Sequence, residues 1–256
     1  MEGYTAQTYG DLFADLYDEM VADSMVAGNA SAAADFLAAL APRGRALELG
    51  IGTGRVALPL AARGVEVHGI DASEKMVARL RDKPGGADLR VDVGDFADVD
   101  APGSFDLVYV VFNTLFALPS QDEQVRCLAN AAARLRPGGR FVVEAFVPDV
   151  TRYDRGQRVQ AVRVDAGQVR LDVSRHDPLN QTITVQNVLI GADGIRLLPV
   201  FLRYAWPAEL DVMARLAGLR LVDRFSGWHR EPFTAASGAH ISVYARTAEG
   251  STPANR

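Results

Sequence analysis

Residues 48–55, Glu-Leu-Gly-Ile-Gly-Thr-Gly-Arg, are the part of the chain whose residue types and spacing most clearly point to chemistry. An acid, Glu48, precedes glycines at alternate positions, Gly50, Gly52 and Gly54. Glycine has no Cβ and adopts positive φ at no steric cost, so the N–H groups of such a turn can lie against a ligand. The acid in the same turn favours a cationic ligand over a phosphate.

Arg55 weighs against a dinucleotide cofactor. The dinucleotide fingerprint carries its third glycine three residues after the second, and Arg55 occupies that position here. The third glycine comes early, at Gly54, and Glu48 would repel a pyrophosphate. A nicotinamide or flavin cofactor is therefore the less well supported alternative.

Two further acids follow strand-like segments. The alternating, β-rich segment 65–70 ends at Asp71, where a carboxylate would accept both hydroxyls of a ribose. Ser73 is the expected N-cap of a helix that runs through Arg81. A third strand-like segment, residues 89–93, ends in Gly94 and Asp95. Suitable residues at the ends of three successive strands argue against coincidence.

These features resemble the class I S-adenosylmethionine (SAM) methyltransferases. The pattern Glu-x-Gly-x-Gly-x-Gly is similar to the first motif of that family, and Leu-Arg-Pro-Gly-Gly before residues 141–146 is frequent in it. The resemblance implies SAM as the cofactor, with Met76 flat on the purine and Asp95 receiving the adenine amino group. The cofactor-binding residues it implies are Tyr17, Glu48, Gly50, Gly52, Arg55, Asp71, Ala72, Met76, Asp95, Phe96 and Val111.

The order of elements predicts an α/β fold. Strands and helices alternate over residues 45–147, which implies a doubly wound, mostly parallel sheet with right-handed crossovers. A helix is expected over 121–136, closed by Pro-Gly-Gly, and another over 207–217. Strands are expected at 219–225 and 240–246, and the resemblance places the last strand antiparallel between two others. The implied architecture is the seven-stranded, Rossmann-like methyltransferase sheet.

Two segments lie outside that core. Residues 1–42 carry an amphipathic helical pattern and are expected to form an N-terminal helical lid. Residues 151–205 contain strand-like runs separated by turn-rich segments, which predicts an antiparallel β insertion for acceptor binding or oligomerisation. The core would then comprise 43–150 and 206–247, and the polar tail 248–256 is expected to be disordered.

Composition narrows the class of partner. The net charge is −5 and no basic run is present, which argues against a nucleic-acid surface. No apolar run reaches membrane length and no signal-peptide layout precedes the core, so we expect a cytoplasmic protein without membrane contact. A single cysteine, Cys127, leaves no internal disulfide or multi-cysteine metal site, and no metal is expected.

The residues around the transferred methyl group are less sharply defined. Asn113 and Phe116 follow the apolar strand 105–112, where Asn113 would orient an acceptor and Phe116 would wall it. Tyr9 and Tyr17 of the lid are the other catalytic candidates, since phenol rings and hydroxyl oxygens favour positive charge. The alternative is that both tyrosines only pack the lid on the core. Trp228 is either a pocket wall or a core anchor.

The whole layout resembles small-molecule N-methyltransferases of actinomycete antibiotic pathways, those acting on amino sugars and those completing lincosamide-type antibiotics. The resemblance implies in-line methyl transfer to the amine nitrogen of a small natural-product intermediate, which needs no lone catalytic base. A homo-oligomer formed through the inserted sheet is a further expectation.

Two alternatives remain open. One is O- or C-methylation of a small metabolite with His176 or His229 as base, although a surface position is favoured for both histidines. His68 and His240 lie in strand-like segments and are expected to be structural. The other alternative is a SAM-binding regulator without catalysis.

Overall fold

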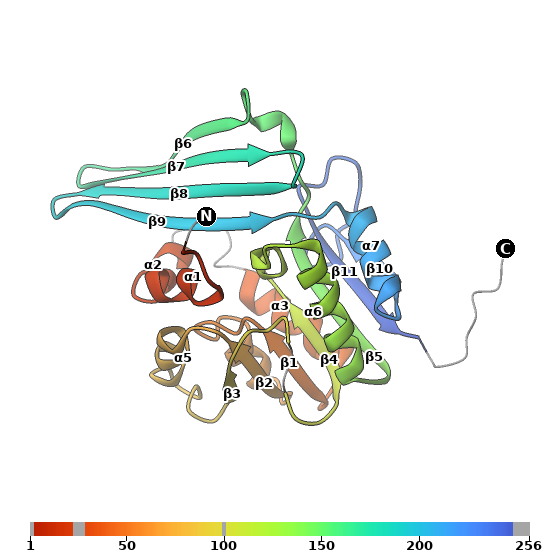
Figure 1. The fold of residues 1–256 in the computed structure, drawn as a ribbon. Helices are drawn as coiled ribbons and strands as arrows, with labels where there is room; N and C mark the ends of the chain where they lie inside the picture. The colour runs from red at the N-terminus through yellow and green to blue at the C-terminus, as the bar shows by residue number, and fades with distance from the viewer. Residues whose placement is uncertain (1–2, 23–28, 99–100, 248–256) are drawn as a thin grey trace.

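The molecule has three parts, which Figure 1 shows one above another: an α/β core, a pair of N-terminal helices, and a separate four-stranded sheet. The structure is a computed structural model that describes residues 3–22, 29–98 and 101–247 of the 256-residue chain. The predicted disordered tail, 248–256, lies outside the described residues. In the ranges described, no helix is long and apolar enough to cross a membrane.

The core sheet has seven strands in the order β10-β11-β5-β4-β1-β2-β3. Strands β1 to β5 pair in parallel, and β11 runs antiparallel between β5 and β10. This confirms the predicted doubly wound sheet and the place of its last strand. The strands are β1 (Arg45–Leu49), β2 (Glu66–Asp71), β3 (Arg90–Val93), β4 (Phe105–Val110), β5 (Leu135–Phe146), β10 (Leu219–Phe225) and β11 (Ala239–Arg246).

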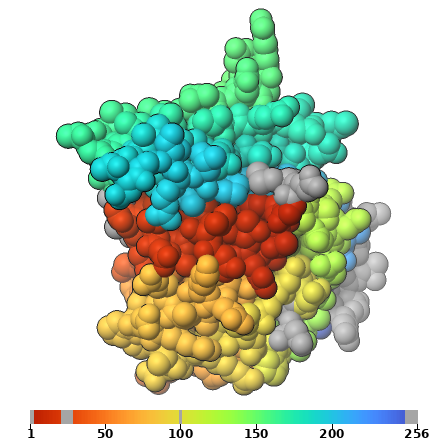
Figure 2. All heavy atoms as spheres, turned by 60° about the vertical axis from the view of Figure 1, so that its left-hand side comes forward, coloured from red at the N-terminus to blue at the C-terminus, as the bar shows by residue number. Residues whose placement is uncertain are grey.

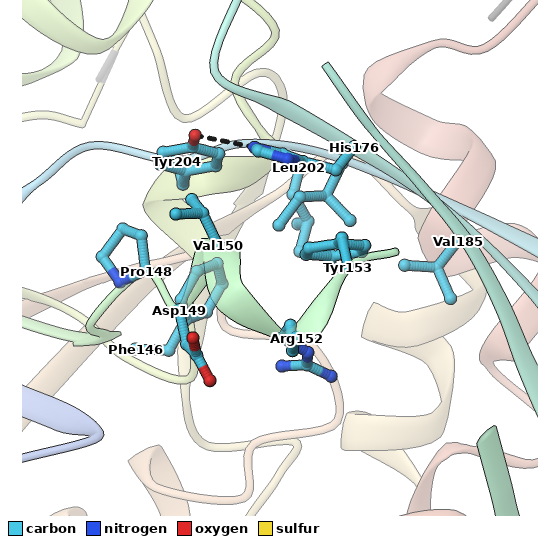
Figure 3. Close-up of a pocket in the computed structure, with 11 residues that line it drawn as sticks. Phe146, Pro148, Asp149, Val150, Arg152, Tyr153, His176, Val185, Leu202 and Tyr204 are labelled. Carbon is cyan, nitrogen blue, oxygen red and sulfur yellow. Dashed lines mark hydrogen bonds between the residues drawn. The ribbon is translucent and has the colours of Figure 1, made fainter. Parts of the chain in front are cut away.

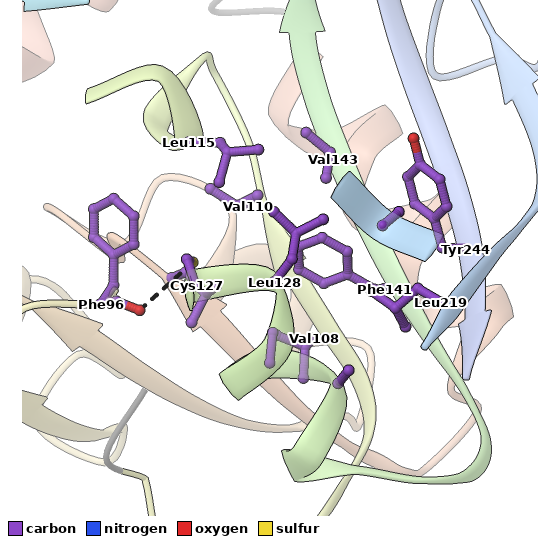
Figure 4. Packing of buried hydrophobic residues seen from close by; sticks show 14 of the residues in the cluster. Phe96, Val108, Val110, Leu115, Cys127, Leu128, Phe141, Val143, Leu219 and Tyr244 are labelled. Atoms are coloured by element: carbon purple, nitrogen blue, oxygen red, sulfur yellow. Dashed lines mark hydrogen bonds between the residues drawn. The ribbon is translucent and has the colours of Figure 1, made fainter. Parts of the chain in front are cut away.

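Helices cover both faces of this sheet, because each face presents an apolar surface. Helices α3 (Asn29–Leu40), α4 (Ala57–Ala61) and α5 (Glu74–Arg81) contribute to the buried cluster on one face. Helices α6 (Gln121–Arg134) and α7 (Pro207–Leu216) close the other face. Figure 4 shows Leu128 and Cys127 of α6 packed against strand residues, where each fully buried Leu contributes about 1.5–3 kcal/mol. Cys127 donates its thiol hydrogen to the Phe96 carbonyl at 3.7 Å.

The start of α5 agrees with its predicted cap, whereas the end of α6 differs from the prediction. The Ser73 hydroxyl accepts from the Met76 N–H and caps α5 as predicted. The prediction that the next helix reaches residue 136 is wrong, because α6 ends at Arg134. Leu135 is recruited into β5, where it pairs with Phe105. Sheet pairing therefore overrides the local helical pattern.

Within the predicted lid segment, 1–42, the described residues form α1 (Ala6–Phe13), α2 (Tyr17–Ala22) and α3. Because α3 packs on the core sheet, only α1 and α2 are called the lid in the description of the structure. Acidic residues on it bond to the core at several points. The Ser73 hydroxyl donates to Asp11 at 2.7 Å, and the Thr53 hydroxyl donates to Asp18 at 2.7 Å. The lid is thus fixed directly over the glycine turn and the start of α5.

The insertion is an antiparallel meander, as predicted, in the order β6-β7-β8-β9. Figure 2 shows the N-terminal helices as a red layer between this sheet and the core. Phe13 of the lid clusters with Leu189 and Leu198 of the sheet, so the lid contacts both neighbours. The strands are β6 (Gln157–Val164), β7 (Gln168–Asp177), β8 (Thr182–Gly191) and β9 (Gly194–Arg203).

Candidate active site

The candidate site lies at the carboxyl ends of β1 and β4. Strand β1 pairs with β2 on one side and β4 on the other, so the chain leaves it in opposite directions. In open α/β sheets, ligands bind in the crevice at such a switch point. The turn after β1, the end of β2 and the loop after β4 all meet there.

The glycine turn has the backbone that its sequence predicts. Gly50, Gly52 and Gly54 have φ values of 73°, 56° and 78°, which favour glycine. A Cβ at Gly54 would lie 2.2 Å from the Leu80 side chain, so this glycine is required for packing. A Cβ at Gly52 would meet nothing within 4 Å. The turn therefore presents an open stretch of backbone against which a cofactor fits.

Asp71 closes the turn onto the end of β2. One carboxylate oxygen accepts from the Gly52 N–H at 2.7 Å and the other from the Ser73 N–H at 2.9 Å. Burial raises the pKa of Asp71, and the two backbone donors oppose that shift. Each oxygen keeps a lone pair for a ligand hydroxyl, which suits the predicted ribose contact.

Glu48 is buried at the centre of the site with 2% of its surface exposed. The Tyr109 hydroxyl donates to it at 2.8 Å, because register pairs the two residues across β1 and β4. Burial raises the pKa of Glu48 to about 8, while Tyr109 and Arg55 pull it down. A cation bound beside this carboxyl would act in the same direction as Tyr109 and Arg55 and lower the raised pKa. The sequence analysis did not identify Tyr109 as a site residue. The one feature that could have indicated it is its hydroxyl group within an otherwise apolar strand.

Tyr9 and Tyr17 bring the lid into this site. The Tyr17 hydroxyl is hydrogen-bonded to Arg55, and the Arg55 guanidinium lies 5.0 Å from the Phe112 ring centre. The Tyr9 ring stacks on Phe13 at 4.4 Å between centroids. Burial raises the pKa of both tyrosines, so they remain neutral phenols. The lid therefore contributes neutral aromatic rings near the half-buried Arg55 guanidinium.

The loop after β4 is held in an unusual conformation. Phe112 and Asn113 have φ values of 55° and 65°, which few non-glycine residues adopt. The Phe112 N–H donates to the Glu144 carboxylate at 2.9 Å, and the Asn113 side-chain oxygen accepts from the Phe146 N–H at 2.7 Å. Burial raises the pKa of Glu144. Strain of this kind clusters at functional sites.

Glu144 was not recognised from the sequence, although it is an isolated acid in an apolar strand. Its second oxygen accepts from the Trp228 indole N–H at 2.9 Å. Trp228 is buried against Phe36, as expected for the core-anchor alternative. Phe116 is fully buried, with its ring edge-on to Phe146 at 5.1 Å. Phe116 and the Asn113 side chain therefore meet at Phe146.

The residues expected around the adenine, and their neighbours, lie in different clusters of the structure. Met76 is buried and packs in the cluster beneath the lid. The Asp95 carboxylate accepts from the Ala97 N–H at 2.9 Å and borders a hollow of about 750 Å³. Phe96 and Val111 are buried side chains of the two main clusters, whereas Ala72 is half-buried.

A smaller cavity, of about 170 Å³, lies between the end of β5 and the inserted sheet. Its wall at β5 is Phe146, the residue bonded to Asn113, so the cavity adjoins the loop after β4. Figure 3 shows that apolar and aromatic side chains line it, with polar groups at its margin. The lining is Phe146, Pro148, Asp149, Val150, Arg152, Tyr153, His176, Ile183, Val185, Leu202 and Tyr204.

His176 lies in this cavity and not at the surface position that the sequence favoured. Its Nε2 is 2.9 Å from the Tyr204 hydroxyl, and its ring stacks on Tyr153 with centroids 4.9 Å apart. The imidazole is therefore held in a fixed orientation. The signal that could have found it is the pair of tyrosines flanking the insertion.

The other histidines lie away from the cavity. His229 is exposed in the loop after β10, as favoured. His68 is buried beside Asp92 at 2.8 Å, and burial lowers the pKa of His240 to about 4. Both strand histidines are structural, as expected.

Sequence comparison finds methyltransferases. A family model described as a methyltransferase domain matches residues 46–139. Cypemycin N-terminal methyltransferase, from a Streptomyces species, is 30% identical over 203 residues, which cover 78% of this chain and 82% of that protein. The matched core includes the glycine turn and the following strand ends.

Solved structures are similar over a longer span. The CcbJ methyltransferase from Streptomyces caelestis matches with a TM-score of 0.89 and 43% identity, covering 96% of this chain and 100% of that one. CalS10 from Micromonospora echinaspora, an amino pentose methyltransferase of calicheamicin biosynthesis solved with SAM bound, has a TM-score of 0.68 and 25% identity. The CalS10 match covers 96% of this chain and 100% of the CalS10 chain, so both matches extend through the inserted sheet.

Proposed function

The chain belongs to the SAM-dependent methyltransferases, and we propose that it methylates the amine nitrogen of a small natural-product intermediate in antibiotic biosynthesis. The enzyme class and the cofactor follow from the family. The amine and the pathway context are the proposal. They are supported by relatives named as an N-terminal methyltransferase and an amino pentose methyltransferase.

SAM supplies a methyl carbon made electrophilic by its sulfonium. The glycine turn suits this cofactor for two reasons. The backbone at Gly52 has no side chain beside it, and the Asp71 carboxylate next to it can accept hydrogen bonds from the ribose hydroxyls. We assign the positive end of the cofactor to Glu48 and the faces of Tyr9 and Tyr17. Met76 and Asp95 are assigned to the adenine end of the cofactor. Arg55, Ala72, Phe96 and Val111 are assigned to the cofactor site as well.

The single observation that carries the acceptor proposal is the cavity beside Phe146. It lies between the end of β5 and the inserted sheet, and its lining residue Phe146 bonds to Asn113 of the loop after β4, so an acceptor held there would approach the site from the side of the insertion. A neutral amine attacks through its lone pair, and its proton leaves afterwards to water. Holding the nitrogen in line with the methyl group can remove roughly 7–11 kcal/mol of the barrier.

The test is S-adenosylhomocysteine release with matched acceptors. Each small amine in the panel is paired with the analogue in which a hydroxyl replaces the amine. We expect turnover with amines and none with their hydroxyl partners. Turnover with hydroxyl acceptors but never with amines would overturn the proposal.

O-methylation is the second candidate, because His176 lies in the cavity with its ring fixed by Tyr204 and Tyr153. In this case His176 would take the hydroxyl proton as methyl transfer proceeds. His176→Gln keeps a hydrogen-bonding side chain but no base. Wild-type turnover in this variant would exclude the second candidate. SAM binding without any transfer would instead support the regulator alternative.

We also propose the division into a lid (1–42), core (43–150 and 206–247) and insertion (151–205), a cytoplasmic location, and a homo-oligomer formed through the inserted sheet. The lid assignment is supported by its bonds to Ser73 and Thr53.

A further inference from the structure

Two adjacent residues of the loop after β4, Phe112 and Asn113, have positive φ, and both donate a backbone hydrogen bond to Glu144 on β5. The Phe112 N–H reaches the Glu144 carboxylate at 2.9 Å, and the Asn113 N–H reaches the Glu144 backbone carbonyl at 3.1 Å. A backbone in this region persists only where its surroundings fix it. Glu144 therefore supplies an acceptor at each strained position of the loop.

This loop connects the two halves of the site. It continues into a short 3-10 helix, η1 (Thr114–Ala117). A Cβ at Gly50 would lie 2.5 Å from Thr114 Cγ2, so η1 packs directly on the glycine turn. On the other side, the Asn113 side chain accepts from the N–H of Phe146, which lines the cavity. The position of the loop therefore sets how the cofactor turn and the cavity face each other.

Glu144 is itself held by Trp228, in the loop after β10. The indole N–H donates to its second carboxylate oxygen at 2.9 Å. Trp228 is buried, with its ring centroid 5.5 Å from that of Phe36 on α3. The Glu231 carboxylate accepts from the His229 N–H at 3.0 Å and closes the loop around the indole. The Glu144 carboxylate thus has a fixed partner on the side away from Phe112.

We propose that Glu144 is a positioning residue for methyl transfer, which holds the loop after β4 in the conformation that aligns the acceptor with the methyl group. An ionised carboxylate suits this role because both of its oxygens accept hydrogen bonds. The amide of a glutamine has one oxygen and one NH2 group, so it would oppose either the Phe112 N–H or the Trp228 N–H with a donor of its own. The inference rests on the proposed function, which holds the acceptor beside this loop.

The first test is Glu144→Gln. We expect kcat to fall roughly 10–100-fold, because a misplacement of about 1 Å can cost about 100-fold. The Kd for SAM is expected to change little, because the Gly50 N–H bonds to the Ile70 carbonyl at 2.8 Å and holds the glycine turn independently. Release of S-adenosylhomocysteine measures the first quantity and titration calorimetry the second.

Glu66→Gln is the matched control, because Glu66 is an exposed carboxylate at the start of β2, at the opposite end of the strand from the site. Both quantities are expected to keep their wild-type values in this variant. A wild-type kcat in Glu144→Gln, or an equal fold-loss in kcat and SAM affinity, would overturn the proposal.

The second test is rescue by a second substitution. Trp228→Phe removes the indole donor and keeps an aromatic ring, and the carboxylate still accepts from Phe112, so the loss of kcat is expected to be small. In the double variant Glu144→Gln/Trp228→Phe, the amide oxygen can accept from Phe112 without an N–H group opposite the amide nitrogen. Its kcat is expected to exceed that of Glu144→Gln. Two independent structural defects would instead add, and a double variant with the lower, additive kcat would overturn the proposal.

The third test needs no acceptor. Hydrogen exchange, followed by mass spectrometry of a peptide covering residues 111–116, reports opening of the loop. We expect faster exchange in Glu144→Gln than in the wild type, and slower exchange again in the double variant. Unchanged exchange in Glu144→Gln would overturn the proposal. A wild type that methylates hydroxyl acceptors but never amines would count against the proposed amine acceptor alone, and kcat of the variants would then be compared with that hydroxyl acceptor.

Discussion

At the scale of single residues, the glycine turn separates two roles that look alike in the sequence. Gly54 is required by packing against Leu80, whereas Gly52 faces open space. Both have positive φ, which costs any L-residue about 1–2 kcal/mol. Substitution of Gly52 is therefore expected to affect mainly ligand binding, and substitution of Gly54 mainly stability.

Gly52→Ala is expected to lower SAM affinity at least tenfold while lowering stability by about 1 kcal/mol, because the added methyl enters the ligand space. Gly54→Ala is expected to lower stability by about 2–4 kcal/mol, since backbone strain adds to overpacking against Leu80. Calorimetry measures the first effect and denaturant unfolding the second. Equal losses of stability in the two variants would contradict this division.

The raised pKa of Glu48 predicts how cofactor binding depends on pH. Its pKa of about 8 lies above the ordinary carboxyl range, so the free protein holds this proton at pH 7. A cationic cofactor favours the ionised form, so binding releases the proton and affinity increases as the pH rises from 6.5 towards 8.5.

Titration calorimetry in buffers of different ionisation enthalpy measures that proton release. Glu48→Gln is expected to bind SAM more weakly with an affinity that no longer changes over this range. An affinity that falls with rising pH in the wild type would contradict the assignment of Glu48.

At the scale of elements, a close contact at Gly10 adds to the polar bonds that position the lid. Gly10 on α1 packs so tightly on the core that a Cβ there would lie 2.4 Å from the Ser73 Cβ. Asp11 on α1 and Asp18 on α2 add hydrogen bonds from the Ser73 and Thr53 hydroxyls, so the lid is held by both its helices.

Gly10→Ala is therefore expected to displace the lid and raise the KM for SAM about tenfold, while the core unfolds at its usual temperature. Gly238→Ala is the control, because a Cβ at Gly238 meets nothing within 4 Å and its φ is not positive. Steady-state kinetics and thermal unfolding together distinguish the lid from the core. An unchanged KM in Gly10→Ala would show that the lid does not cover the cofactor.

The elements also show what the sequence could and could not predict. The turn at Gly50, the cap at Ser73 and the four strands of the insertion depend on local residue patterns, and all were predictable. Tyr109 and Glu144 acquire their roles only from long-range pairing, through the β1–β4 register and the loop after β4. Local reasoning has no access to either contact.

The acceptor side was predictable in outline and not in detail. The insertion was expected to serve acceptor binding, but the partner of His176 was not recognisable. His176 and Tyr204 lie on different parts of the meander and meet only when its strands align. The same alignment brings Val164, Val169, Ile190 and Ile195 into one uncharged row across the sheet, which a strand-by-strand reading does not reveal.

At the scale of the whole molecule, cofactor binding is expected to stabilise the fold. A ligand at about 100 times its Kd adds about 2.7 kcal/mol. For a chain of this size, that raises Tm by roughly 5–11 °C. A thermal scan with and without SAM measures the shift, and Gly52→Ala is expected to lose most of it at the same SAM concentration. A full shift in this variant would place the cofactor elsewhere.

The layered lid sets the order in which a newly made chain can complete its site. Phe13, near the start of the chain, packs with Leu198 on the last strand of the insertion. Most of the residues assigned to the cofactor lie between these two positions, and they leave the ribosome before Leu198 does. The lid therefore lacks its upper support until β9 has been synthesised, and this distant contact, which closes a long loop, is expected to form late in folding. The N-terminus of this enzyme is made first and is among the last parts to reach its place.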